Sequence, residues 1–241
     1  PSAEPARSQR SAKLRRAARW SAIALGCGAL VLLVAAVVAV ASIYPRLPDI
    51  SELADYRPKL PLRVYTVEGT LIGEFGEERR NLTPFASIPK VMKDAVLAVE
   101  DARFYDHGGV DYKGFARAAV ASLKGGRKQG ASTITMQVAR NVYLSSERTM
   151  SRKTYEIMLA FRLEQQLTKD QILEIYLNQI YLGNRAYGFA SASDTYFGKP
   201  LKDITIAQAA MLAGLPKSPS GNNPFINPNR ARSTRARWPA K

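Results

Sequence analysis

Cysteine and histidine are almost missing from this chain of 241 residues. The single cysteine, Cys27, excludes an intrachain disulfide framework and any metal site built from several cysteines. The single histidine, His107, excludes metal sites built from paired histidines. With 46% hydrophobic and 23% charged residues, the remaining composition is that of an ordinary globular protein, which excludes a chain that is disordered throughout.

Negative charge is also scarce, because 20 acidic residues stand against 35 basic ones and the formal net charge is +15. Residues 1–20 and residues 221–241 each carry a net charge of +5, which leaves +5 for the long stretch between them. A folded face that binds nucleic acid would place its charge inside the domain. We therefore expect no nucleic acid among the partners of this protein.

Charge is absent altogether from residues 21–43, which are bracketed by Trp20 and Tyr44. A helix of this length spans about 35 Å, against about 30 Å for the hydrocarbon core of a bilayer. Six basic residues precede the run, so the sequence predicts a single-pass transmembrane helix with residues 1–20 as a basic cytoplasmic tail. The alternative is a cleaved signal peptide, whose apolar region would be shorter and end in a cleavage site; no clear cleavage pattern precedes Pro45.

Beyond the apolar run, the sequence predicts a juxtamembrane linker over residues 44–84. Residues 63–67 and 70–75 alternate in polarity around Glu68-Gly69, which is typical of a β-hairpin. From residue 85 the periodicity becomes helical, and we expect one mainly α domain over residues 85–225. A basic C-terminal tail over residues 226–241 follows.

Two helix starts in this region carry the pattern of a capping box. Thr168 and Thr205 each precede a glutamine by three residues and open an apolar-periodic run. A third helix follows a glycine loop over residues 130–137, with Ser132 or Thr133 as its N-cap. The free N–H groups at such a helix start bind anions, although a plain capped helix gives the same pattern.

A pair of carboxylates, Glu100 and Asp101, ends another predicted helix. The negative end of the helix dipole and partial burial both raise the pKa of a carboxyl group at this position. A raised pKa suits a group that accepts or donates a proton near neutral pH. The alternative is a solvated helix end, where charged pairs are commonly found.

A group of cations forms the third candidate. Arg152 and Lys153 precede Glu156 by four and three residues, so the three side chains share a helix face. Arg140 and Arg148 lie close by in the sequence, and four cations near a capped helix start suit a diphosphate. The alternative is a surface ion pair, which contributes little to stability.

Together these segments resemble the peptidoglycan glycosyltransferases of glycosyltransferase family 51, the domain at the N-terminal end of class A penicillin-binding proteins. Four family motifs carry the resemblance, and in the second of them Met136 replaces a glutamine. They are E-D-x-x-F-x-x-H-x-G from Glu100 to Gly109, G-x-S-T-I-T-Q-Q from Gly130 to Gln137, R-K-x-x-E from Arg152 to Glu156 and K-x-x-I-L-E-x-Y-L-N from Lys169 to Asn178. A fifth stretch covers residues 209–216 with Asn223-Pro224.

The resemblance implies a lysozyme-like fold and an inverting enzyme. Such an enzyme polymerises lipid II into β-1,4-linked glycan strands and releases polyprenyl diphosphate. It implies that Glu100 is the base, that Glu156 orients the donor and the cations, and that the cations offset the charge of the leaving diphosphate. The remaining positions that it assigns to substrate or diphosphate binding are Asp101, Phe104, His107, Ser132, Thr133, Gln137, Arg140, Arg148, Arg152 and Lys153. Of these, Phe104 and His107 are expected to shape the loop.

The same resemblance implies a location and partners. We expect the catalytic domain on the periplasmic or outer side of the bacterial cytoplasmic membrane, with a lobe at residues 112–128 dipping into the bilayer. The expected partners are lipid II, the growing glycan strand, the membrane and other proteins of cell-wall synthesis. A divalent cation, Mg²⁺ or Mn²⁺, could share the diphosphate, although the sequence holds no dedicated metal motif.

Two alternatives stay open at this point. One is a lysozyme-like glycan hydrolase or lytic transglycosylase, against which the cation cluster argues, because a hydrolase has no diphosphate to hold. The other is a non-catalytic membrane-anchored scaffold of the wall-synthesis machinery. The transpeptidase motifs S-x-x-K, S-x-N and K-T-G do not follow the domain, so we expect no transpeptidase activity from this chain.

Overall fold

The structure is a computed structural model that describes residues 4–48, 61–76, 78–123, 125, 130, 132–143 and 150–235. It divides the chain into two units, Pro1–Leu47 and Pro48–Lys241, which are described separately here. The first unit is the helix α1, Glu4–Ile43, followed by the 3-10 turn η1, Tyr44–Arg46. Within the described part of the chain, no helix is both long and apolar enough to cross a bilayer, so the transmembrane segment stays a prediction.

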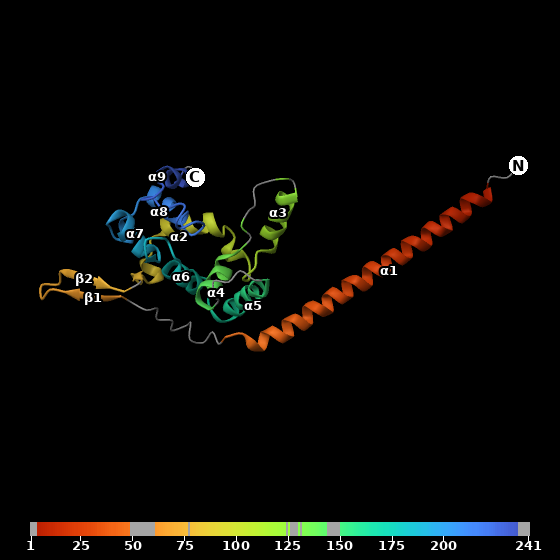
Figure 1. The fold of residues 1–241 in the computed structure, drawn as a ribbon, viewed down its shortest axis with the longest axis horizontal. Coiled ribbons are helices and arrows are strands. Elements are labelled where there is room, and N and C mark those ends of the chain that lie inside the picture. The colour runs from red at the N-terminus through yellow and green to blue at the C-terminus, as the bar shows by residue number, and fades with distance from the viewer. Residues whose placement is uncertain are drawn as a thin grey trace. The chain divides into compact units, whose positions relative to one another are not determined.

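The second unit is mainly helical, as the sequence predicts (Figure 1). Its strands are short and form two separate two-stranded sheets. The α-helices are α2 Lys90–Glu100, α3 Tyr112–Leu123, α4 Ile134–Tyr143, α5 Met150–Gln166, α6 Lys169–Gln179, α7 Phe189–Phe197, α8 Ile206–Ala213 and α9 Pro228–Arg235. Short 3-10 turns lie between them: η3 Phe85–Ser87, η4 Phe104–Asp106 and η5 Leu201–Asp203.

The predicted β-hairpin is present. Strand β1, Leu62–Tyr65, pairs antiparallel with β2, Leu71–Phe75. The strands are shorter than predicted because the turn takes up residues 66–70, where Thr66 N–H donates to the Thr70 carbonyl at 2.8 Å. Gly69 adopts φ +85° in this turn, a backbone conformation that favours glycine.

Helix α4 lies at the centre of the second unit. It packs against α5 on one side and α6 on another, while α2 packs against α8. The buried apolar side chains of these helices form one core, to which α4 contributes Ile134, Val138 and Ala139. Helix α3 stands apart from the other helices in Figure 1, and Ala118 is the one side chain that it buries.

Both predicted capping boxes are confirmed. The Thr168 and Thr205 side chains accept hydrogen bonds from the backbone N–H groups of Gln171 and Gln208, each at 3.3 Å. In return, the two glutamine side chains accept from the threonine N–H groups at 2.8 and 2.9 Å. These bonds satisfy N–H groups that helix starts leave unpaired, which explains why α6 and α8 begin where they do.

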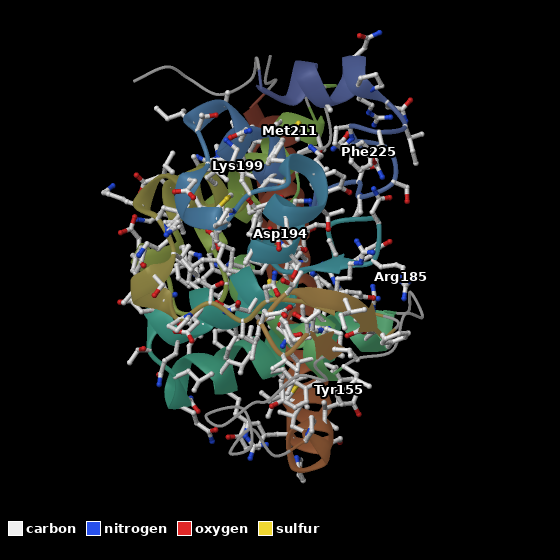
Figure 2. The ribbon with its side chains drawn as sticks, turned by 90° about the vertical axis from the view of Figure 1, so that its left-hand side faces the viewer. Tyr155, Arg185, Asp194, Lys199, Met211 and Phe225 are labelled. Carbon is white, nitrogen blue, oxygen red and sulfur yellow. The ribbon has the colours of Figure 1, made fainter. Side chains whose placement is uncertain are left out.

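The segment that enters the helical domain is held by side chains rather than by a large sheet. Strand β3, Arg79–Arg80, pairs parallel with β4, Ala186–Tyr187. Asn81 N–H then donates to Ser191 Oγ at 2.7 Å, and its side chain donates to Asp194 at 3.1 Å. Asp194, labelled in Figure 2, lies on α7. We call residues 79–85 the docking segment, because each contact ties them to α6, α7 or β4.

Asn178, a member of the fourth motif, makes the most complete contact with the docking segment. Its Oδ1 accepts from Thr83 N–H at 2.9 Å, and its Nδ2 donates to the carbonyls of Thr83 and Glu174 at 3.0 Å each. Glu174 of the same motif accepts from Phe85 N–H at 3.1 Å. The motif therefore positions the docking segment in this fold.

Replacing Asn178 by alanine is expected to lower the free energy of unfolding by about 2–3 kcal/mol, since it removes three hydrogen bonds and leaves buried backbone groups unpaired. Urea denaturation of wild type and variant checks this value. Asn227→Ala is the matched control, because exposed Asn227 makes one long side-chain bond of 3.3 Å to the Gly221 carbonyl, and we expect a change within about 0.5 kcal/mol. Equal effects from both substitutions would contradict this interpretation.

Candidate active site

The end of α2 and the start of α4 meet at one carboxylate. Asp101 directly follows Glu100, the last residue of α2, and its φ of −158° is no longer helical. Its Oδ2 accepts from Ile134 N–H, the first residue of α4, at 3.0 Å, and its Oδ1 lies 3.0 Å from His107 Nε2. Asp101 therefore fixes the loop of the first motif against the helix start of the second motif.

The N-cap of α4 is Thr133, one of the two residues that the sequence allows. Its Oγ1 accepts from Met136 N–H at 3.2 Å and donates to the Gly109 carbonyl at 2.6 Å. Gly109 adopts φ +89°, and a Cβ there would lie 3.1 Å from the Ala160 backbone on α5. The loop of residues 101–109 is thus held at both of its ends.

Phe104 and His107 lie inside this loop. The Phe104 ring is buried and meets the His107 ring edge-on, with centroids 6.3 Å apart. Lys169 Nζ lies 4.4 Å from the Phe104 ring centroid and donates to the His107 carbonyl at 2.5 Å. Neither aromatic side chain is among the residues that line the cavity described below, and their role in shaping the loop stays a prediction.

Glu100 has a mixed electrostatic environment. Burial raises the pKa of its carboxyl group above the ordinary value, and the neighbouring Asp101 adds to this effect. A hydrogen bond from Gln137 Nε2 to Glu100 Oε2 at 2.8 Å works in the other direction, as do the charges of Lys217 and Arg140. The net result is a carboxylate with a raised pKa, held in position by an amide and faced by two cations.

Two of the four predicted cations, Arg152 and Lys153, lie beside Glu156, whose side chain is 1% exposed. Lys153 Nζ donates to Glu156 Oε2 at 2.9 Å, and Arg152 Nε lies 3.5 Å from Glu156 Oε1. Lys153 also donates to Ser132 Oγ at 3.1 Å, which brings the third motif against the second. Arg148 lies outside the described residues.

One cavity of about 530 Å³ joins the two halves of the site. Glu100 and Ser132 both line it, so the carboxylate and the hydroxyl held by Lys153 open into the same space. The lining is more polar than apolar and combines residues of the first two motifs with others: Ala98, Val99, Glu100, Asp101, Ala102, Arg103, Asp111, Gly114, Phe115, Arg117, Gly130, Ser132, Thr133 and Lys217.

Three charged lining residues, Arg103, Asp111 and Lys217, were not selected by the reasoning from sequence. Lys217 follows α8 by a short loop, and its only sequence signal was its place one residue after the fifth motif stretch. Arg103 and Asp111 form an ion pair in the cavity wall, and Arg103 holds the pKa of Asp111 below its usual range. Arg103 occupies an unspecified position of the first motif, so the motif itself gave no reason to select it.

A bound divalent cation would need ligands from the protein or from a substrate. Among the residues that the structure describes, no group of three or more His, Cys, Asp and Glu side chains is arranged to hold a metal ion. The carboxylate of Glu156 is already paired with Lys153 and Arg152. The residues that the structure describes therefore form no dedicated metal site.

Comparison with known proteins defines the class to which this fold and site belong. Residues 68–240 match the family model described as transglycosylase, and the chain belongs to this family. It is 56% identical over 200 residues to penicillin-binding protein 1A of Neisseria flavescens, covering 83% of this chain and 25% of that protein. It is 49% identical over 220 residues to penicillin-binding protein 1A of Pseudomonas aeruginosa, covering 91% of this chain and 26% of that protein.

A solved structure also matches. The crystal structure of penicillin-binding protein 1A from Haemophilus influenzae aligns with 75% of this chain and 17% of its own, at 29% identity and a TM-score of 0.39. The chain spans about a quarter of the length of the curated relatives it matches. The match to the family model and the identity to penicillin-binding protein 1A confirm the family resemblance that the motifs indicated, while the roles of individual residues stay predictions.

Proposed function

We propose that this domain is a peptidoglycan glycosyltransferase that joins lipid-linked disaccharides, lipid II, into β-1,4-linked glycan strands. The single observation that carries the proposal is the shared cavity. A carboxylate with a raised pKa, Glu100, opens into the same space as Ser132, whose hydroxyl is held by Lys153. Transfer of a sugar from a diphosphate requires a base and nearby cations, and Lys153 reaches this cavity through its bond to Ser132.

The chemistry assigned to Glu100 is removal of the proton from the 4-hydroxyl of the acceptor sugar. The freed oxygen forms a bond to the anomeric carbon of the donor as the bond between that carbon and the diphosphate breaks. The electron pair leaves with the polyprenyl diphosphate, and the α-linked donor gives a β-linked product. A base positioned for this proton contributes roughly 10²- to 10⁴-fold to the rate.

The cations have the complementary task. Negative charge grows on the diphosphate as it leaves, and ammonium and guanidinium groups offset it better in a partly enclosed cavity than in bulk water. Lys153 donates to Ser132, which lines the cavity, and buried Glu156 pairs with both Lys153 and Arg152. Arg140 and Lys217 face Glu100 and are placed to act near the reacting centre.

The proposed reaction takes place at a membrane surface, because the polyprenyl chain of the substrate lies in the bilayer. We infer that residues 21–43 anchor the protein in the bacterial cytoplasmic membrane with the catalytic domain on the outer side, on the grounds of charge distribution given above. Helix α3 is the inferred lobe at the bilayer surface. Tyr112, Phe115 and Leu123 are exposed on it, with exposed fractions of 68%, 62% and 88%, and exposed Lys113 and Arg117 can reach phosphate headgroups.

The experiment that tests the function gives the full chain, in detergent or liposomes, labelled lipid II and, separately, purified sacculi. We expect glycan strands from lipid II, loss of this product with moenomycin, the inhibitor of the family, and no release of sugar from sacculi. Release of sugar from sacculi with lipid II untouched would show a hydrolase instead. Binding of lipid II without turnover would favour the scaffold alternative.

The pH dependence of the reaction follows from the environment of Glu100. The base must be charged to accept a proton, and burial raises its pKa above the ordinary 4.5. We therefore expect kcat/KM to fall on the acid side with a midpoint clearly above pH 4.5. Initial rates from pH 4 to 9 check this, and an acid limb at or below pH 4.5 would contradict the assignment of Glu100 as the base.

A further inference from the structure

Helix α3 forms one wall of the cavity described above. It contributes Gly114, Phe115 and Arg117 to the lining. The helix buries little against the rest of the fold, because Ala118 is the only buried side chain along α3, which the structure describes throughout. Figure 1 shows α3 standing apart from the other helices. The position of this wall therefore depends on contacts other than a packed apolar face.

Asp111, the residue before α3, makes the contacts that fix the start of the helix. Its carbonyl accepts from Phe115 N–H at 2.8 Å, and its Oδ1 accepts from Gly114 N–H at 2.9 Å, as in an N-cap. A Cβ at Gly114 would collide with Asp111 Oδ2, so glycine allows the carboxylate to lie where it does. The same Oδ1 also accepts a hydrogen bond from Arg103 Nη2. Asp111 thus joins the start of α3 to Arg103.

Arg103 belongs to the loop that follows the proposed base. It stands three residues after Glu100, and the next residue, Phe104, is buried and donates its N–H to the Asp101 carbonyl at 3.0 Å. The side chains of Arg103 and Asp111 are 28% and 15% exposed, so the ion pair is partly shielded from water. The pair therefore connects the wall formed by α3 to the segment that carries Glu100.

We propose that Arg103 and Asp111 are positioning residues, whose ion pair holds α3 in place as a wall of the substrate cavity. The inference rests on the proposed function, because the cavity is a substrate site only in that reaction. Substrate binds to the fraction of molecules in which the wall is in place, so breaking the pair lowers the apparent affinity for lipid II. Glu100 and the cations paired with Glu156 are not altered, so the step after binding keeps its rate.

Arg103→Met tests the proposal in the full chain, because methionine is unbranched and long but cannot pair with Asp111. The bond from Gly114 N–H to Asp111 is left available. We expect KM for lipid II to rise by about three- to fivefold, the range for loss of a partly exposed ion pair, with little change in kcat. Lys90→Met is the matched control, since it breaks the exposed pair with Asp94 at 2.6 Å and should leave KM unchanged. A fall in kcat at unchanged KM in Arg103→Met, as from less folded enzyme, would overturn the inference.

Gly114→Ala separates this role from a direct contact between Arg103 and the substrate. The added Cβ displaces the Asp111 carboxylate, while the helix propensity of alanine offsets the weakened cap, so the melting temperature should change little. We expect KM to rise as in Arg103→Met. The double variant should show no more than the larger single effect, since both changes break the same pair. A wild-type KM in Gly114→Ala, or additive effects in the double variant, would contradict the proposal.

A measurement without lipid II follows α3 itself. Hydrogen exchange of the α3 backbone amides should be faster in Arg103→Met than in the wild type, because the helix start loses its link to the loop, while exchange in α4 should stay the same. Equal exchange of α3 in the two proteins would overturn the inference and leave the proposed function standing. If the wild-type chain makes no glycan from lipid II, the proposed function fails, and the exchange result still decides whether the pair holds α3.

Discussion

Replacing Glu100 by glutamine is expected to slow lipid II polymerisation by roughly 10²- to 10⁴-fold and to leave lipid II binding largely unchanged. Glutamine keeps the size of the side chain and can still accept the hydrogen bond that Gln137 donates at 2.8 Å. It cannot take up a proton from the acceptor sugar, so the loss falls on the chemical step. Initial rates of strand formation and direct lipid II binding separate the two effects.

The same substitution is expected to keep or raise the stability of the fold, although it lowers the reaction rate. Because burial raises the pKa of Glu100 in the folded chain, its contribution to stability is present below the ordinary pKa of 4.5 and is lost as the pH rises through the folded pKa. Glutamine is neutral at every pH, so it avoids the cost of burying a charged carboxylate. At pH 8 we therefore expect the Glu100→Gln variant to melt at or above the wild-type temperature. Glu68→Gln, at an exposed position of the hairpin turn, should change neither rate nor stability. Wild-type turnover in Glu100→Gln would refute the assignment of the base.

Replacing Glu156 by glutamine is expected to have the second-largest effect, a fall in kcat of roughly 10²-fold. The substitution removes the carboxylate that holds Lys153 at 2.9 Å and Arg152 at 3.5 Å, and leaves two neighbouring cations to repel each other. Lys153 would then lose its fixed position beside Ser132. Because the charge on the diphosphate grows during the reaction, kcat should fall more than KM rises.

Asp94→Asn provides the control for Glu156→Gln. Asp94 pairs with Lys90 at 2.6 Å on an exposed face of α2, and such pairs contribute about 0–1 kcal/mol. We expect its polymerisation rate to match that of the wild type. If Glu156→Gln also kept the wild-type rate, the cation group would have no part in stabilising the leaving diphosphate. That result would contradict the part of the mechanism assigned to the cations.

The parts of the fold that depend on local chemistry could be predicted from the sequence. The capping boxes at Thr168 and Thr205 needed only residues three apart, and the hairpin needed only alternation around Glu68-Gly69. The pairing of Arg152 and Lys153 with Glu156 likewise followed from helical spacing. In each case, the residues that decide the structure lie close together in the sequence.

Contacts between distant segments could not be predicted in this way. Lys217 enters the cavity from beyond α8, far in the sequence from Glu100, and no spacing rule connects the two. Asn178 belongs to a motif that the family resemblance singled out, yet its contact with the docking segment appears only in three dimensions. Tyr176 is the tyrosine of the same motif, and only the packing of α6 on α4 shows that its hydroxyl is buried without a hydrogen-bond partner among the described residues.

The central claim is that Glu100 and the cations paired with Glu156 act on one bound substrate, with Glu100 and the Ser132 hydroxyl lining the same cavity. The structure of the Glu100→Gln variant in complex with lipid II tests it most directly. The account predicts the 4-hydroxyl of an acceptor sugar against the side chain at position 100, and the donor diphosphate beside Ser132 and Lys153. A diphosphate bound elsewhere, or an acceptor hydroxyl out of reach of position 100, would contradict the account.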